Sequence, residues 1–259
     1  MEPVDRAADG GSGRLTYRER APHPALADDI ACTWSDSARP GLRVLPDGCI
    51  DIVWIGDEAL TVAGPDTGAN VIGLPEGTLT VGVRFRPGRA PGFLGARADE
   101  LTNQSVGLDA LWGSEAAVLA EALAAAKSVE GKQAILEAAL LERLDGAGQV
   151  DADVDAALDV IAGAPSQTRI GALSRELNIS ERQLRRRFEQ AVGYGPKTFG
   201  RVLRFRAFLS LVEEHGYSLA AAASEAGYAD QAHLTRECND LAGLSPAELI
   251  AVRNVQDAG

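Results

Sequence analysis

The chain has 259 residues, of which 46% are hydrophobic, and it carries a formal net charge of -12 at pH 7. This length is sufficient for two domains that each bury a core. The three cysteines are too few and too scattered for a disulfide framework, and the sequence shows neither a signal peptide nor an apolar run that could span a bilayer, so we expect a cytoplasmic protein.

The first part of the chain has the pattern of an irregular arm followed by short strands. Residues 1–13 are polar, contain glycine and lack periodicity, and we expect them to form a flexible arm. Residues 79–85 alternate between apolar positions and polar or small ones, which is typical of a half-buried strand. Turn residues separate several more short strands within 42–66. Frequent short strands predict a small barrel or sandwich.

Four residues in this part are candidates for binding a small molecule. Cys49 and Asp51 lie two residues apart, so a strand would place them on one face. Asp51 is either a ligand contact or a structural hydrogen-bond acceptor that closes the preceding turn. Trp54 would line a pocket or belong to the core, and Arg84 would bind an anion or lie on a solvated exterior. The cysteines and histidines lack metal-binding spacing, so we expect no metal and no cofactor.

Beyond residue 91 the hydrophobic period returns to 3.6. Four helices are predicted, at 91–98, 109–112, 114–127 and 131–144. The apolar stripes of the last two either pack onto the β-rich part or form a dimer interface. A glycine-rich break then predicts a linker at 145–151, which divides the chain into an N-terminal domain at 14–145 and a C-terminal domain at 151–255.

Residues 170–192 predict two short helices that meet at a tight turn. Apolar residues recur at helical spacing on both sides of the turn. Ser180 is suited to cap the second helix, and Gln183 completes a capping box. Leu184 and Phe188 would face inward. The side chains that would project outward near the N-terminal end are those of Arg182, Gln183, Arg185 and Arg186. These positions are suited to contact base edges in a major groove, and a solvated basic face is the alternative.

A second copy of this pattern lies about fifty residues downstream, at 219–246. Gly243 corresponds to Gly193, and Asp230 takes the capping position. A long helical run over 197–214 joins the two units. Because a duplex presents its major groove again every ~34 Å, two such units on one connecting helix could contact adjacent groove segments.

With these features, residues 151–252 resemble the DNA-binding domain of the AraC/XylS family of bacterial transcription regulators. The motifs that carry the resemblance are Leu184, Arg186 and Phe188 of the first unit, then GYGPKTF, Arg204-Phe205-Arg206, AGYADQAHLTR and GLSPAEL. It covers about two fifths of the chain. The resemblance implies a sequence-specific regulator that is not an enzyme, with double-stranded DNA and RNA polymerase as partners.

The N-terminal part also resembles a domain that accompanies this family, through LPDGCIDIVW, GVRFRPG and ELTNQSVGLDALWG. The family implies a cupin-like sensory barrel for a small-molecule effector, and the following helices as a homodimer interface. The predicted fold class is therefore α+β: a β-rich N-terminal barrel, then helices, then an all-α C-terminal domain in which a long helix joins two helix-turn-helix units.

The resemblance also assigns roles to individual residues. The base-contacting positions are Arg182, Arg185 and Arg186 of the first unit and Gln231, His233 and Arg236 of the second, with Arg204 and Arg206 on the connecting helix. The second unit departs from the family at Cys238 and Ala232, and Glu237 and Asp240 would oppose phosphate, so we expect the first unit to supply more of the affinity.

The division of charge supports this assignment. From residue 166 onward 12 Lys and Arg stand against 11 Asp and Glu, whereas the preceding part has 13 against 26. The acidity therefore belongs to the N-terminal part, and the arginines of the C-terminal part are concentrated on the first unit and the connecting helix.

Two competing functions remain at this level. An enzyme that accepts alkyl groups from DNA would use Cys49 as its nucleophile, but the neighbouring Asp51 would raise the pKa of the thiol and suppress the reactive thiolate. A protein adaptor would use the same helical fold to contact a protein, and it would tolerate the loss of both Arg185 and Arg186.

Overall fold

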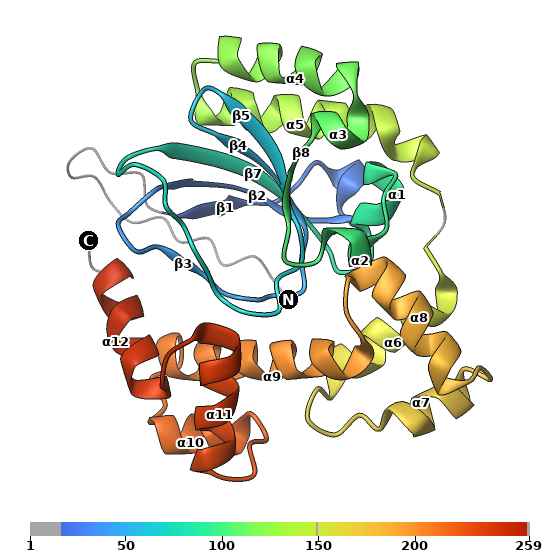
Figure 1. The fold of residues 1–259 in the computed structure, drawn as a ribbon, viewed down its shortest axis with the longest axis vertical. Coiled ribbons are helices and arrows are strands. Elements are labelled where there is room, and N and C mark those ends of the chain that lie inside the picture. The colour runs from blue at the N-terminus through green and yellow to red at the C-terminus, as the bar shows by residue number, and fades with distance from the viewer. Residues whose placement is uncertain (1–16, 149, 258–259) are drawn as a thin grey trace.

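The computed structural model describes residues 17–148 and 150–257 (Figure 1). It has a β-rich N-terminal part with covering helices and an all-helical C-terminal part, which confirms the predicted α+β class. The arm predicted at 1–13 lies outside the described residues. Within the described ranges, no helix has both the length and the apolar character needed to cross a membrane.

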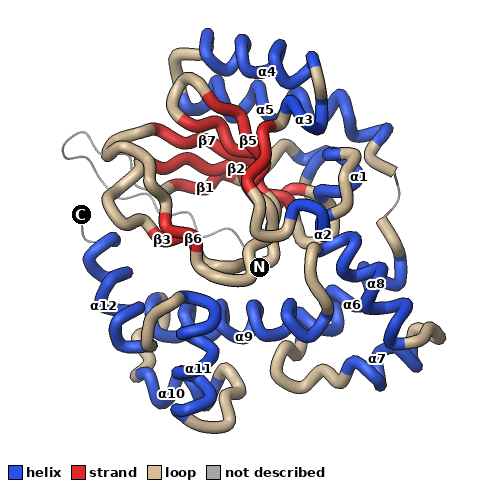
Figure 2. Tube along the Cα trace, in the orientation of Figure 1, coloured by secondary structure: helices blue, strands red, loops and turns tan. Residues whose placement is uncertain are grey.

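The N-terminal part is built on one antiparallel sheet (Figure 2). The sheet has six strands in the order β1-β2-β7-β4-β5-β8. These strands are β1 (Arg18–Arg20), β2 (Ile30–Ser37), β4 (Asp51–Ile55), β5 (Ala59–Ala63), β7 (Leu79–Phe85) and β8 (Ser105–Gly107). The described strands leave the sheet open, which corrects the expectation of a closed barrel. The strands that could have extended it, β3 (Arg43–Val44) and β6 (Asn70–Val71), are very short and pair with each other instead.

Helices cover one face of this sheet. They are α1 (Ala90–Leu94), α2 (Ala98–Leu101), α3 (Asp109–Trp112), α4 (Ser114–Ala125) and α5 (Val129–Arg143), with 3-10 turns at η1 (Pro24–Leu26) and η2 (Leu144–Gly146). Ile52, Trp54 and Phe85 on the sheet share a core with Leu123 of α4 and Leu140 of α5. The apolar stripes predicted for these two helices are therefore explained by packing onto the sheet.

The opposite face of the sheet carries a smaller apolar cluster of Cys32, Trp34 and Val53. The Trp34 indole lies directly over Gly82 of the neighbouring strand, where a Cβ atom would come within 2.4 Å of the ring. Position 82 therefore needs glycine, because any larger residue would displace the indole.

The C-terminal part has a separate core around a long helix (Figure 1). Its helices are α6 (Ala152–Gly163), α7 (Ile170–Glu176), α8 (Glu181–Val192), α9 (Pro196–Glu213), α10 (Leu219–Glu225), α11 (Gln231–Ala242) and α12 (Pro246–Asp257). Helix α9 joins the first unit, α7–α8, to the second unit, α10–α11. The core includes Phe188, Phe205 and Leu234, and it also takes in Leu45 from the N-terminal part. The predicted domain boundary at 145–151 falls between the two main cores.

Candidate nucleic-acid interface and its contacts with the N-terminal part

The first recognition helix, α8, forms where the sequence predicts it and exposes the predicted arginines. Ser180 Oγ accepts from the backbone nitrogen of Gln183, and Gln183 Oε1 accepts from the backbone nitrogen of Ser180 at 3.0 Å. The predicted capping box is therefore present. The buried side of α8 consists of Leu184, Phe188 and Val192. Its exposed side includes Arg182, Gln183, Arg185 and Arg186. This half of the predicted site lies on one accessible helix.

Two of these exposed residues already have partners on α8. The Arg185 guanidinium pairs with Glu189 at 2.7 Å while its side chain remains 72% exposed. Such a surface pair is weak enough for a phosphate or a base to replace. Gln183 is more restricted because its Oε1 caps the helix. Bidentate contact with adenine needs both the carbonyl and the amino group of a glutamine, so Gln183 can offer only its amino group while the cap is intact.

The second recognition helix, α11, exposes fewer of its predicted contacts. Gln231 and Arg236 are exposed. His233 is only partly exposed, and its ring meets Tyr228 edge-on at 5.1 Å between centroids. The His233 Nδ1 accepts from the Ala229 amide, which leaves the proton on Nε2, 3.4 Å from a Glu237 oxygen. His233 is thus part of an internal network, and its assignment as a base contact stays a prediction.

Glu237 is the centre of that network, and its position corrects one expectation. The residue is 3% exposed, so its carboxylate does not face outward against phosphate. It accepts two hydrogen bonds from Arg204 of α9, at 2.8 and 2.6 Å, and lies 3.6 Å from Arg201. Arg204 also lies over the Tyr228 ring, 5.0 Å from its centroid. The predicted DNA contact of Arg204 is disfavoured, because its guanidinium is held by this buried pair.

Helix α9 presents different faces to the two parts of the chain. Phe199 packs against the turn before β4, where a Cβ on Gly48 would lie 2.8 Å from its ring. Arg206 follows seven residues later, about two helical turns on, and so shares this face. Arg206 is exposed, and the phosphate contact that the sequence predicts for it stays a prediction.

The residues proposed for effector binding separate into two groups. Arg84 donates to both carboxylate oxygens of Asp51, at 3.1 and 3.0 Å, and lies 3.4 Å from Asp47. Trp34 Nε1 donates to the same Asp51 carboxylate at 3.0 Å. Asp51 is therefore structural, and its hydrogen bonds go to side chains on the neighbouring strands. The turn before β4 is closed by Asp47 instead, whose carboxylate accepts from the Cys49 backbone nitrogen. Arg84 is correspondingly not a solvated exterior residue.

Trp54 belongs to the other group, on the helix-covered face of the sheet. It is 1% exposed and packs with the core under α4 and α5. Asp51 and Trp54 are three positions apart on β4, and side chains alternate along a strand, so they point to opposite faces. This parity was visible in the sequence and would have separated Trp54 from Cys49, Asp51 and Arg84.

The thiol of Cys49 has the wrong environment for a nucleophile. Burial raises its pKa well above the ordinary value, and the Asp47 carboxylate raises it further. A thiol held in this way is protonated and weakly reactive. Among the described residues, no group of three His, Cys, Asp or Glu side chains is arranged to hold a metal ion.

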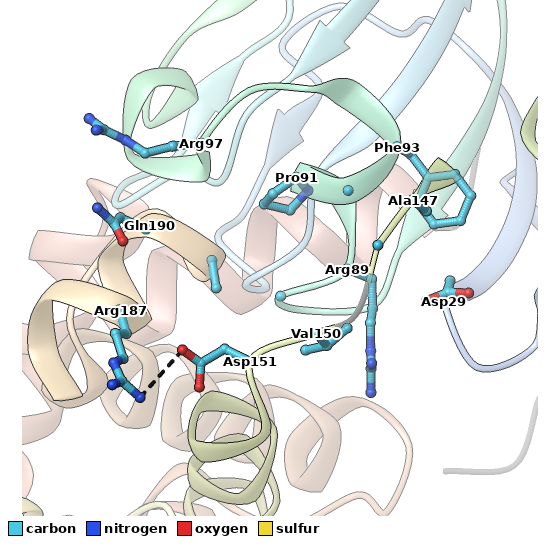
Figure 3. A pocket seen from close by; sticks show the side chains of 14 residues that line it. Asp29, Arg89, Pro91, Phe93, Arg97, Ala147, Val150, Asp151, Arg187 and Gln190 are labelled. Carbon is cyan, nitrogen blue, oxygen red and sulfur yellow. Dashed lines mark ion pairs between the residues drawn. The ribbon is translucent and has the colours of Figure 1, made fainter. Parts of the chain in front are cut away.

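A cavity of about 280 Å³ lies where the N-terminal part, the linker and α8 meet (Figure 3). Its charged lining is largely neutralised in pairs. Arg187 of α8 pairs with Asp153 at 2.6 Å, and Arg89 pairs with Asp155 of α6 at 2.7 Å. The Arg89 bond crosses between the two parts of the chain. Sequence patterns did not indicate this cavity, because its walls come from segments far apart in the chain.

Two further contacts join the N-terminal part to the ends of the recognition helices. Thr102 Oγ1, just after α2, donates to the carbonyl oxygen of Gly193 at 2.7 Å. Arg43 Nη1 of β3 donates to the carbonyl oxygen of Ala242 at 2.9 Å. Neither residue had a sequence signal, since a polar side chain that donates to a distant carbonyl leaves no local pattern.

Two families of known proteins match separate parts of the chain. Residues 18–107 match a family described as a domain of unknown function (DUF6597), and residues 173–251 match a family described as a helix-turn-helix domain. The second match includes all of α8, α9 and α11. No curated protein matches the chain.

Among solved structures, the chain is similar to ToxT from Vibrio cholerae. A crystal structure of an apo ToxT variant shares 10% identity with a TM-score of 0.49, and the match covers 89% of this chain and 98% of that chain. Wild-type ToxT bound to an unsaturated fatty acid shares 10% identity with a TM-score of 0.48, over 85% of this chain and 94% of that chain. These TM-scores are below 0.5, so the similarity assigns no function to this chain.

Proposed function

We propose that this chain is a transcription regulator of the AraC/XylS family and that it places α8 and α11 in two adjacent major-groove segments of duplex DNA. The observation that carries the proposal is the cluster of exposed guanidinium groups at the N-terminal half of α8, namely Arg182, Arg185 and Arg186. A recognition helix contacts base edges through this end. Arginine is also the side chain best suited to bind guanine through two hydrogen bonds.

In this mechanism, affinity and specificity come from different contacts. Arginines near the phosphates release counterions, which gives an affinity that falls steeply with salt. Arg186 on α8 and Gln231 and Arg236 on α11 supply base discrimination of ~1–3 kcal/mol for each good contact. The first unit contributes more because its recognition helix α8 exposes three arginines, whereas α11 exposes only Arg236.

Selection from randomised duplex DNA tests the proposal, with full-length protein at a fixed salt concentration. We expect a motif of two half-elements about one helical turn apart. Arg186→Ala should weaken binding to this motif by ~1–3 kcal/mol and relax one base position. Arg86→Ala is the matched control, since Arg86 is an exposed arginine that donates to Ala27 within the N-terminal part.

The same experiment separates this function from the adaptor alternative. A protein adaptor would enrich no sequence, and its partner binding would survive the loss of both Arg185 and Arg186. The alkyl-acceptor alternative is disfavoured by the raised pKa of the Cys49 thiol. It would require Cys49→Ser to abolish activity while DNA binding persists.

We further propose that a small-molecule effector acts on the N-terminal part and changes how this part holds the two helix-turn-helix units. Support comes from the bonds of Thr102, Arg43 and Arg89 to the C-terminal part. An effector can shift DNA binding only if it binds the competent and incompetent states with different affinity. A melting-temperature screen of full-length protein, followed by DNA titration with each hit, tests this. A true effector must change both the Tm and the Kd for DNA.

A homodimer through α4 and α5 is a further proposal. The inner sides of these helices pack against the sheet, but Val118 on α4 is 68% exposed. Val118→Asp should convert a dimer to a monomer in sedimentation equilibrium. An unchanged mass for this variant would remove α4 from the interface.

A further inference from the structure

The two recognition helices end in the same way, and the N-terminal part holds both ends. Each helix is followed by a glycine in the left-handed region, Gly193 with φ of 98° and Gly243 with φ of 68°. Next to these ends, the carbonyl oxygen of Gly193 accepts from Thr102 Oγ1 at 2.7 Å, and that of Ala242 accepts from Arg43 Nη1 at 2.9 Å. Carbonyls at a helix C-terminus carry partial negative charge, so both are good acceptors.

A single short segment of the N-terminal part also touches both ends. We name residues 65–69, between β5 and β6, the strap. Pro65 lies against Gly193, where a Cβ atom added to the glycine would come within 2.4 Å of the proline ring. At the other end of the strap, a Cβ on Gly68 would lie 3.5 Å from the carbonyl oxygen of Asp240 on α11. Three residues span at most ~11 Å, so the strap links the two helix ends over a short distance.

The strap is itself held in place on both sides. Asn103 Oδ1 accepts from the Thr67 backbone nitrogen at 2.8 Å and from Thr67 Oγ1 at 3.1 Å. The backbone nitrogen of Asn103 donates to the carbonyl oxygen of Pro65 at 3.3 Å. Ala69 packs against the core of the C-terminal part. The following β6 pairs with β3, in which Arg43 lies opposite Val71. Strap and donors thus form one connected unit.

We infer that the strap, together with Thr102 and Arg43, sets the separation of the two recognition helices and thereby the half-element spacing that the protein accepts. This inference rests on the proposed binding of DNA by α8 and α11. Within the C-terminal part the two units are connected mainly through α9, and the strap adds a second connection at the far ends of the recognition helices. A second connection restricts their relative motion. Thr102 and Arg43 are accordingly positioning residues, since they act through the helix ends.

A spacing series tests the inference. The half-elements selected by the full-length wild-type protein are placed on duplexes whose spacing is the optimum or differs by one or two base pairs, and the Kd is measured for each. The wild type should show a sharp optimum. Thr102→Val and Arg43→Ala should each reduce the ratio between off-optimum and optimum Kd by about threefold to tenfold, the range expected for one lost hydrogen bond.

Conservative variants and matched controls separate positioning from general damage. Thr102→Ser and Arg43→Lys retain a donor and should restore the sharp optimum. Thr80→Val and Arg86→Ala each remove a bond of the same type that stays within the N-terminal part, to Asp36 and Ala27, and should leave the optimum unchanged. If Arg43→Ala does not fold, Asn103→Gly replaces it, because glycine keeps the positive φ of 56° but removes the acceptor for Thr67.

The outcomes distinguish this inference from the proposed function. If the wild type selects no two-element motif, the proposed function fails. If the wild type has a sharp optimum and the Thr102 and Arg43 variants keep it, the inference alone fails. A uniform loss of affinity at every spacing also overturns the inference, since that pattern indicates only a structural role.

Discussion

The two helix-turn-helix units share a backbone plan but direct their charged side chains differently. In the first unit, Arg182, Arg185 and Arg186 point to solvent from α8. In the second unit, Glu237 is buried and binds Arg204 of the connecting helix. The same local fold therefore serves two purposes. The first unit offers charge to a partner, whereas the second unit uses charge to fix its own recognition helix on α9.

The comparison extends to the cores. Position 188 in the first unit is phenylalanine, in contact with Phe199, and the corresponding position in the second unit is Cys238. Both are fully buried. The smaller side chain provides less apolar contact, and the Glu237–Arg204–Tyr228 network holds the second unit by polar contacts beside it.

The largest expected effect is on stability, from breaking this network. Glu237→Ala leaves Arg204 buried without its partner, which should reduce the free energy of unfolding by ~3–5 kcal/mol. The comparison variant is Glu189→Gln, which breaks the exposed pair with Arg185 and should cost less than ~0.5 kcal/mol. Urea denaturation of both variants measures the difference. Equal, small losses would show that the buried network does not stabilise the second unit.

The next effect is on the salt dependence of DNA binding. Replacing Arg182 and Arg185 together with alanine should reduce the slope of log K against log salt by ~2, and Arg236→Ala by at most ~1. The reason is that the first unit exposes more guanidinium groups. Titrations at several salt concentrations give both slopes. A larger change for Arg236→Ala would reverse the assignment of the main electrostatic contact to α8.

The smallest effect concerns the strap beside the first unit. Burial, and then the charge of Asp47, raise the pKa of Asp66 to about 6. A carboxyl whose pKa is higher in the folded state destabilises the fold when ionised, so the penalty is present above about pH 6 and fades as the pH falls toward ~4. Asp66→Asn should therefore raise the free energy of unfolding at pH 8 by only ~1 kcal/mol, since the side chain is partly exposed.

The pH dependence of this variant also checks its cause. At about pH 4 the wild-type carboxyl is largely protonated, and Asp66→Asn should then have little effect on stability. Burial, with smaller contributions from Asp47, Cys49 and Asp66, raises the pKa of Tyr194, which follows α8. The second unit has Leu244 at the corresponding position. A stabilisation that is the same at both pH values would exclude the charge of Asp66 as its origin.

Sequence patterns predicted the local elements well, because their determinants lie within a few residues. The capping box of Ser180 and Gln183, the cap at Asp230 and the short helix at 109–112 all occur as predicted. Errors arose where a partner came from elsewhere. The sequence left Arg84 either as an anion contact or as an exterior residue, and in the structure it pairs with Asp51 of the neighbouring strand. The grouping of Trp54 with Asp51 was a different error, since strand parity alone excludes it.

By itself, the sequence determined that this protein has two capped helix-turn-helix units on a connecting helix, behind a β-rich part. Hydrophobic period and helix caps are read from neighbouring residues, so they need no tertiary information. Only the tertiary structure decided that the sheet stays open, that Glu237 turns inward to Arg204, and that Thr102 and Arg43 hold the ends of both recognition helices. These features depend on contacts between segments distant in the chain, whose geometry the packing of two cores sets.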